Sequence, residues 1–217
     1  MSGGTRFDRS LNETLSQKVV PSVTLPSCIR MTHAPLFRVP GLVESRPVAG
    51  SPHRRSRSLP GHLPQAAPGE VLAWTDGACQ RNPGPGGWAA VVSWEDGVVE
   101  EYSGGLPHTT NNIMEMTAAL EGLRALPPGS LACIVTDSRY LHDGMTSWIS
   151  GWKRRDWKTA SGDPVKNKEI WVQLTAAASG HERVRWHWVR GHTGHALNER
   201  ADVLAVAAAR NAARSVR

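Results

Sequence analysis

The sequence predicts a mixed α/β fold in which helices cover both faces of a five-stranded sheet. Two observations lead to this prediction. Three consecutive strand-like segments open the globular part of the chain, and strand and helix patterns then alternate to give the order β-β-β-α-β-α-α-β-α. Consecutive antiparallel strands followed by strand–helix alternation are typical of a sheet with both antiparallel and parallel neighbours.

The strands are predicted from short apolar runs that are bounded by turn residues. The triplet Glu95-Asp96-Gly97 is a hairpin signal between the second and third runs, and the fourth run is continuously apolar until it reaches Asp137. The five predicted strands are residues 71–75, 87–94, 98–104, 131–137 and 183–191.

The helices are predicted from apolar residues that recur at helical spacing. The first helix follows a polar loop at residues 106–112 and ends before Pro127-Pro128, and Ser138 is a suitable N-cap for the second. The predicted helices cover residues 113–126, 138–152, 165–178 and 198–213.

The two parts of the chain differ in composition. Residues 1–68 contain nine Lys and Arg against three acids, together with nine prolines, whereas residues 69–217 contain sixteen residues of each sign and all nine Trp. The first part has no persistent apolar period, so residues 1–68 are predicted to be a disordered basic extension. Residues 69–214 are long enough to bury a core of their own and are predicted to form the catalytic domain.

Composition also limits the location of the protein. No segment approaches the roughly 20 apolar residues of a membrane helix, and the three separated cysteines form neither a disulfide framework nor a zinc pattern. A reducing compartment is expected, and the cytoplasm is the predicted location. Two alternatives stay open for the first 68 residues. The first is that these residues are an organelle transit peptide. The second is that the protein begins downstream of residue 1, for example at Met31.

Four acids occupy unusual positions. Asp76 and Asp137 each end a predicted strand, in the contexts "WTDG" and "VTDS", and we expect Asp76 to be only partly buried at the sheet edge. Glu115 is expected in the first turn of its helix, and Asp202 lies among apolar residues of the last helix. Singly, such acids are more often caps, turn formers or partners of the helix dipole.

Taken together, the acids point to a metal site. If the first and fourth strands are neighbours, Asp76 and Asp137 lie side by side, and converging carboxylates repel one another unless a cation is present. A set of oxygen ligands suits Mg²⁺ or Mn²⁺. A pair of such ions is the usual apparatus for in-line displacement at phosphorus.

Four collinear segments then resemble type 1 ribonuclease H (ribonuclease HI) over about residues 70–212. They are "TDGACQRNPGPGGWAAV", "TTNNIMEMTAALEGL", "VTDSRYLHDGMTSWISGWKRRDWKTASGDPVKNKEIW" and "WVRGHTGHALNERADVLA". The resemblance implies an RNase H-like fold and hydrolysis of the RNA strand of RNA–DNA hybrids, leaving 5′-phosphate and 3′-hydroxyl ends. It also implies two Mg²⁺ ions, with Mn²⁺ as a substitute, bound by Asp76, Glu115, Asp137 and Asp202.

The same resemblance extends to residues around these acids. His192 matches a mobile loop that assists catalysis or product release, whereas His195 matches no such role. A polar set is predicted to bind the substrate, although turn formation and helix capping explain the same residues and both roles can hold. This set is Asn82, Thr110, Asn111 and Asn112.

A basic segment is predicted to grip the DNA strand. It contains Lys153, Arg154, Arg155 and Lys158, interleaved with Trp148, Trp152 and Trp157, and basic residues with aromatics suit a nucleic-acid backbone. A solvated charged surface is the alternative. Trp74, Trp88, Trp171 and Trp186 are expected in the core, and Ile113 and Arg139 depart from the basic residue and the Gln that are common at these positions in the family.

Two rival functions are weighed against the ribonuclease. A catalytically silent hybrid-binding module would not need all four acids, and a DNA-processing relative, such as a junction resolvase or an integrase, would not need the basic segment and "TTNN" together. The predicted partner is therefore an RNA–DNA hybrid, with no membrane association, and the protein is expected to be a monomer.

Overall fold

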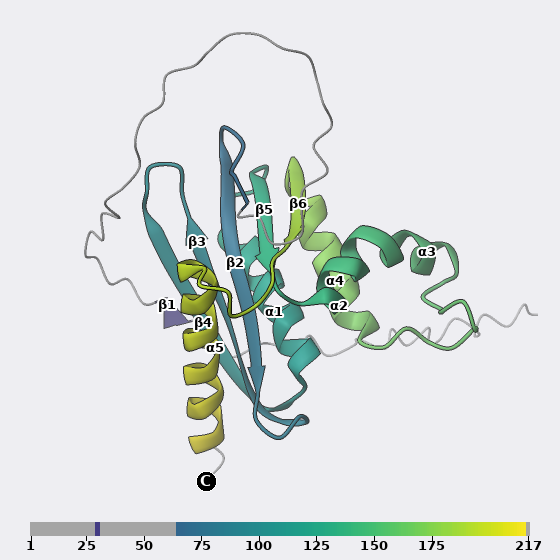
Figure 1. Cartoon of the computed structure of the whole chain (residues 1–217). Helices are drawn as coiled ribbons and strands as arrows, with labels where there is room; N and C mark the ends of the chain where they lie inside the picture. Colours follow the sequence, from purple (N-terminus) through teal and green to yellow (C-terminus); the bar gives the residue numbers. More distant parts are fainter. Residues whose placement is uncertain (1–28, 31–63, 216–217) are drawn as a thin grey trace, which may run out of the picture.

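The computed structural model describes residues 29–30 and 64–215 (Figure 1). Most of the predicted disordered extension, residues 1–68, lies outside this described part of the chain. Within the described part, no helix is long and apolar enough to cross a membrane.

The sheet has six strands in the order β1-β4-β3-β2-β5-β6. Strands β4, β3 and β2 are antiparallel neighbours, and β2, β5 and β6 are parallel neighbours, so the predicted mixed five-stranded sheet is confirmed. A short strand from the N-terminal region, β1, adds to the edge of β4 and was not predicted. The strands are β1 (Ile29–Arg30), β2 (Glu70–Cys79), β3 (Gly84–Ser93), β4 (Val99–Thr109), β5 (Leu131–Thr136) and β6 (Arg183–Trp188).

Helices cover both faces of the sheet, as predicted (Figure 1). One face is covered by α1 (Asn111–Ala125), and α4 (Lys168–Ser179) packs with it around a core that includes Leu120, Ile134 and Trp171. The other face is covered by α5 (Ala196–Arg214), where Trp74 packs with Ala201. A Cβ atom on Gly87 would collide with the backbone of α5, so this glycine permits the close approach of the helix to β3.

Between β5 and α4, the chain forms a helix whose middle part is a short π-helix. Its parts are α2 (Arg139–Asp143), η1 (Gly144–Trp148) and α3 (Ile149–Arg154), where a single helix is predicted. Gly144 lies so close to the Trp171 indole that a Cβ atom there would overlap the ring. The π-helix begins at the residue that makes this contact with Trp171. Because a π-helix is a local irregularity, the spacing of apolar residues alone does not predict it.

Two further boundaries differ from the prediction. Residues 106–109 belong to β4 rather than to a loop, because this stretch is an edge strand that accommodates Pro107 and polar residues. Helix α4 begins at Lys168 rather than near Val165. The Val165 N–H donates to the Trp157 carbonyl (2.9 Å), so Val165 belongs to the preceding loop. Among the expected core tryptophans, Trp74, Trp88 and Trp171 are buried, whereas Trp186 is half-buried and packs against the core.

Candidate active site

The fold brings the four acids of the sequence pattern into one electrostatic group. Strands β2 and β5 are parallel neighbours in which Thr75 is paired with Thr136, so Asp76 and Asp137 follow at adjacent positions. Asp76 interacts electrostatically with Asp137, Asp202 and Glu115. These side chains come from β2, the end of β5, α5 and α1, which is why they are far apart in the sequence.

Two details of their placement were predicted wrongly. Asp76 lies inside β2, which stays paired with β3 as far as Cys79 although its pairing with β5 ends at Thr75. The residue is 8% exposed, so it is buried rather than partly exposed at the sheet edge. Glu115 is beyond the first turn of α1, because the helix begins at Asn111.

Asp76 is an uncompensated buried carboxylate. Burial, followed by repulsion from Asp137, raises its pKa from 3.8 to about 8, while the Gly77 N–H, which donates to Oδ1 at 2.6 Å, opposes the shift. Within the described residues, no Lys, Arg or His forms an ion pair with it. Such a group is stabilised either by a proton or by a cation from solution.

Glu115 is fixed through both of its carboxylate oxygens. The Asn111 side-chain amide donates to Oε1 (2.8 Å), and the Ser138 hydroxyl donates to Oε2. Burial raises the pKa of Glu115, the Ser138 hydrogen bond opposes this, and repulsion from Asp137 adds to it. A Cβ atom on Gly77 would collide with the α1 backbone at Glu115, so this glycine permits α1 to bring its carboxylate close to β2.

Asp137 is positioned by the last residue of β6 and by the segment that follows this strand. The Trp188 indole N–H donates to the Asp137 backbone carbonyl (2.9 Å), and a Cβ atom on Gly191 would collide with the Asp137 carboxylate. Burial raises the pKa of Asp137, whereas a hydrogen bond with the Asn198 side chain and the nearby His192 lower it.

Asn198 was not singled out in the sequence. It is 2% exposed and lies on α5, four residues before Asp202. Residues at this spacing share one face of a helix. A polar residue one turn before a candidate metal ligand is the signal that identifies it.

The two loop histidines lie in different surroundings. His192 is exposed, has a left-handed backbone (φ 54°) and is close enough to influence Asp137. His195 occupies the N-cap position of α5, and its ring centroid is 6.3 Å from that of Trp74. The structure therefore brings His192 close to Asp137, while His195 lies against Trp74.

The polar set connects the β2–β3 turn to Glu115. Asn82 Oδ1 accepts a hydrogen bond from the Asn111 backbone N–H (3.2 Å), and the Asn111 side chain donates to Glu115. Thr110 is the N-cap of α1 and accepts from the Ile113 N–H (3.4 Å), while Asn112 is exposed. Thr110 and Asn111 thus have structural roles beside the predicted substrate contacts.

The basic segment lies on α3 and the turn after it, in a lobe that projects from the sheet (Figure 1). Lys153, Arg154, Arg155 and Lys158 are all exposed. Their aromatic neighbours pack inward, because Trp148, Trp152, Trp171 and Tyr140 form a cluster with ring centroids 5.3–6.1 Å apart. Among these aromatics, Trp148 keeps 38% of its surface exposed.

Arg139, one of the departures from the family pattern, lies next to Ser138 at the start of α2. Its guanidinium carbon is 3.6 Å from the centroid of the Trp188 ring, a cation–π contact. Ile113, the other departure, packs against the cluster of Trp88, Met114 and Ala118.

The four acids fit a hard divalent cation by chemistry, because all their donors are oxygen and they repel one another without one. Across residues 29–30 and 64–215, no three His, Cys, Asp or Glu side chains are arranged to hold an ion as they stand. Glu115 explains part of this, since both of its oxygens are engaged with Asn111 and Ser138. The fold fixes the backbone positions of the four acids, and rotation of their side chains would be needed to bring their oxygens onto one ion.

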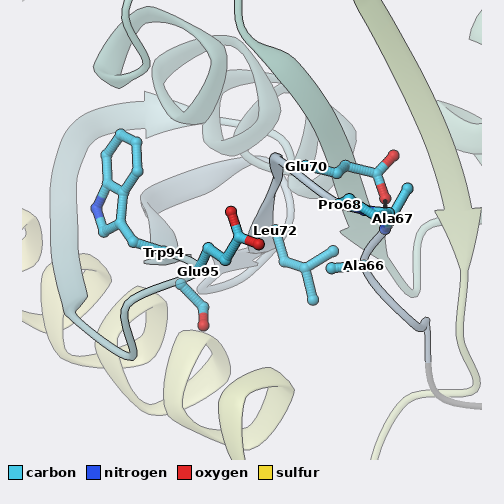
Figure 2. Close-up of a pocket in the computed structure, with 8 residues that line it drawn as sticks. Ala66, Ala67, Pro68, Glu70, Leu72, Trp94 and Glu95 are labelled. Atoms are coloured by element: carbon cyan, nitrogen blue, oxygen red, sulfur yellow. Dashed lines mark hydrogen bonds between the residues drawn. The ribbon is translucent and has the colours of Figure 1, made fainter. Parts of the chain in front are cut away.

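A hollow of about 390 Å³ lies at the opposite end of β2 (Figure 2). Its buried carboxylate, Glu70, is already bonded to Arg185 and to the Ala67 N–H. Without free converging polar groups, this hollow does not have the chemistry of a catalytic site. It is lined by Ala66, Ala67, Pro68, Glu70, Leu72, Ser93, Trp94 and Glu95.

Comparisons with known proteins agree with this site. The RNase H family matches residues 68–210. A ribonuclease H of Alkalilimnicola ehrlichii is 54% identical over 135 residues, which are 62% of this chain and 91% of the relative. For a ribonuclease H of Rhodopseudomonas palustris, the identity is 54% over 135 residues, covering 62% of this chain and 86% of the relative.

Among solved structures, LC9-RNase H1, a type 1 RNase H with the type 2 active-site motif, is 35% identical with a TM-score of 0.58. The match covers 70% of this chain and 75% of that protein. The chain therefore belongs to the RNase H family. Within that family it is a type 1 ribonuclease H, an endoribonuclease, which confirms the resemblance seen in its motifs.

Proposed function

We propose that this ribonuclease hydrolyses the RNA strand of RNA–DNA hybrids with two divalent metal ions, leaving 5′-phosphate and 3′-hydroxyl ends. The observation that supports this best is Asp76, a buried carboxylate beside three other acids, which forms no ion pair with any cation among the described residues. Hydrolysis at phosphorus by hard cations is the chemistry that such a group serves.

The acids Asp76, Glu115, Asp137 and Asp202 would hold the ions, and Mg²⁺ or Mn²⁺ suits their oxygens. When bound, such ions supply a nucleophilic water at neutral pH and stabilise charge on the leaving oxygen. The protein's part is to fix the carboxylates. Asn198 orients Asp137, and Ser138 and Asn111 hold Glu115, which would give up one of these hydrogen bonds on binding an ion.

His192 would move protons at the rim of the site. An imidazole titrates near neutral pH, and the exposed loop places His192 near Asp137. The glycines that flank it, Gly191 and Gly194, leave this loop free of bulky side chains.

Substrate contacts are proposed on two sides of the acids. The turn and helix start would contact sugar edges and phosphates across the minor groove, where RNA exposes its 2′-hydroxyls, through Asn82, Thr110, Asn111 and Asn112. The exposed cations of the lobe would hold the DNA strand through Lys153, Arg154, Arg155 and Lys158. A catalytic domain of residues 69–214, a monomeric state and a cytoplasmic location remain predictions.

One assay tests the proposal against its rivals. The full chain is incubated with Mg²⁺ and with end-labelled RNA–DNA hybrid, duplex DNA or duplex RNA of one sequence. We expect cleavage of the RNA strand of the hybrid alone, with 5′-phosphate on the downstream product. Cleavage of duplex DNA would favour a DNA-processing enzyme, and binding without any cleavage would favour a silent module.

A further inference from the structure

A second group of cations lies where the C-terminal half of α5 meets the β2–β3 turn. Arg210 and Arg214 are one helical turn apart, and together with Gln80 and Ala213 they line a hollow of about 230 Å³. Arg81 follows Gln80 in the turn and has a left-handed backbone (φ 55°). All three arginines are exposed, and we call Arg81, Arg210 and Arg214 the turn patch.

The turn patch is uncompensated. In the described part of the chain, none of its arginines forms an ion pair or a side-chain hydrogen bond, whereas Arg200, on the same helix, binds both carboxylate oxygens of Glu101 (2.7 and 2.8 Å). Arg210 and Arg214 are like charges at i and i+4, an arrangement that destabilises a helix slightly. Residues 69–217 carry no net charge, so this local excess of positive charge is not a general property of the domain.

Strand β2 and helix α5 each connect the turn patch to one of the four acids over a short distance. Gln80 is four residues beyond Asp76, which corresponds to roughly 13 Å of extended strand. Arg210 is eight residues beyond Asp202 on α5, about 12 Å of helix. The neighbour of Arg81 in the turn, Asn82, is linked to Glu115 through Asn111.

The turn patch and the basic lobe lie on different sides of the acids. Helix α5 packs on β2, β3 and β4, whereas the lobe continues from α2, which packs on β5 and β6 (Figure 1). Cations at the end of a helix also stabilise its dipole, which accounts for Arg214 in the last turn. The helix dipole does not account for Arg81, which is on a different element.

We propose that the turn patch is a second phosphate-binding site, which holds the sugar–phosphate backbone of the hybrid a few nucleotides from the cleaved bond. This rests on the proposed function, because it takes the hybrid as the ligand. The exposed guanidinium groups suit phosphate oxygens, to which they donate paired hydrogen bonds. Contacts on both sides of the acids would fix the register of the duplex over the site.

The test compares Arg210→Gln/Arg214→Gln with Arg200→Gln, a matched control on the same helix whose charge is already neutralised by Glu101. Binding of a fluorescent hybrid is measured without divalent metal at several salt concentrations, and KM and kcat are measured with Mg²⁺. Loss of two phosphate contacts should weaken binding roughly tenfold and reduce the slope of log K against log[salt] by about two. KM should rise while kcat stays near the wild-type value, and Arg200→Gln should match the wild type.

A hybrid too short to span from the acids to the turn patch should bind the double variant and the wild type equally. Arg81→Asn, which suits the left-handed backbone, gives an independent variant with a loss of about one in the salt slope. Wild-type binding and salt slope in these variants, with unchanged thermal unfolding, would overturn the turn patch alone. Absence of hybrid cleavage by the wild-type chain would instead overturn the proposed function, while the metal-free binding series would still report on the turn patch.

Discussion

Strand β2 carries two buried carboxylates, and the fold treats them in opposite ways. Glu70 is 2% exposed and accepts hydrogen bonds from Arg185 at 2.6 and 3.0 Å, so its pKa is lowered. Six residues later, Asp76 is 8% exposed and forms no ion pair with the described residues; burial, followed by repulsion from Asp137, raises its pKa to about 8. The fold supplies a cation to the structural carboxylate Glu70, whereas in the described part of the chain it supplies none to Asp76, the carboxylate that we propose binds metal ions.

Glu70 also explains how the domain begins. Arg185 on β6 donates both to Glu70 and to the Gln65 carbonyl (3.1 Å), and Glu70 accepts from the Ala67 N–H (3.0 Å). The pair therefore fixes the segment before β2 to the far end of the sheet. The carboxylate at this end maintains the fold, whereas the acids at the other end are the ones that we propose hold the metal ions.

The largest effect is expected from Asp76→Asn. Removing this charge should lower turnover of a hybrid about a thousandfold or more, because metal-assisted hydrolysis depends on it, while affinity for the hybrid stays close to the wild-type value. Single-turnover cleavage and metal-free binding measure the two quantities. Asp96→Asn, the same change in the hairpin turn, should have no effect, and an active Asp76→Asn protein would refute the role of the residue.

Glu70→Gln tests the structural end of the strand. It leaves Arg185 without its partner and should lower the free energy of unfolding by about 1–3 kcal/mol, less than for a fully buried pair because Arg185 is partly exposed. Urea unfolding measures this, and turnover well below the unfolding temperature should be unchanged. Glu121→Gln, which breaks the exposed pair with Arg124, should cost less than 1 kcal/mol. If Glu70→Gln and Glu121→Gln lowered the free energy of unfolding equally, the pair of Glu70 with Arg185 would have no special structural role.

The pH dependence of metal-free stability should differ in sign at the two ends. The pKa of Glu70 is lowered in the folded state, so its contribution is present above the unfolded pKa and is lost as pH falls through the folded value. The pKa of Asp76 is raised, so the folded state holds its proton more tightly and stability declines as pH rises from about 4 to about 8.

Asp76→Asn should therefore be more stable than the wild type at pH 8 in the absence of metal, by about 1–2 kcal/mol. The gain should shrink at pH 5, where the wild-type carboxyl is largely protonated. Chemical unfolding in a chelator at both pH values measures this. A variant that is less stable than the wild type at pH 8 would mean that Asp76 is compensated by a group other than a metal ion.

Asp76 and Glu70 also differ from each other in how much of their surroundings the sequence predicts. The acids and the order of strands and helices along the chain follow from local patterns, since Asp76 and Asp137 each adjoin an apolar run. That these two strands are neighbours was only a condition of the sequence argument, and the structure supplies it. The depth of Asp76 does not follow, because it depends on how far β2 continues along β3 and on the helices that cover this part of the sheet. The partner of Glu70 is 115 residues away, and only the fold brings Arg185 to it.

Contacts made by uncharged residues were equally hard to predict. Ser138 is recognisable as a helix cap, yet its hydroxyl also holds Glu115 on another helix. Asn198 has the helical spacing of a residue that shares a face with Asp202, but its bond to Asp137 depends on how α5 crosses the end of β5. Such contacts join segments that no local pattern relates.

The smallest expected effect concerns Arg139, a cation two residues after Asp137 that the Trp188 ring holds in a cation–π contact. If this contact keeps the charge from compensating the acids, Arg139→Gln should leave turnover and the Mg²⁺ concentration for half-maximal activity within about twofold, and cost about 0.5–1 kcal/mol of stability. Arg190→Gln, at an exposed position after β6, serves as the control. If Arg139 did compensate the acids, removing it would strengthen metal binding, because competition from a fixed cation would disappear. If Arg139→Gln markedly lowered the Mg²⁺ concentration for half-maximal activity, Arg139 would have the same role as Arg185. It would be a cation that the fold supplies to a buried carboxylate.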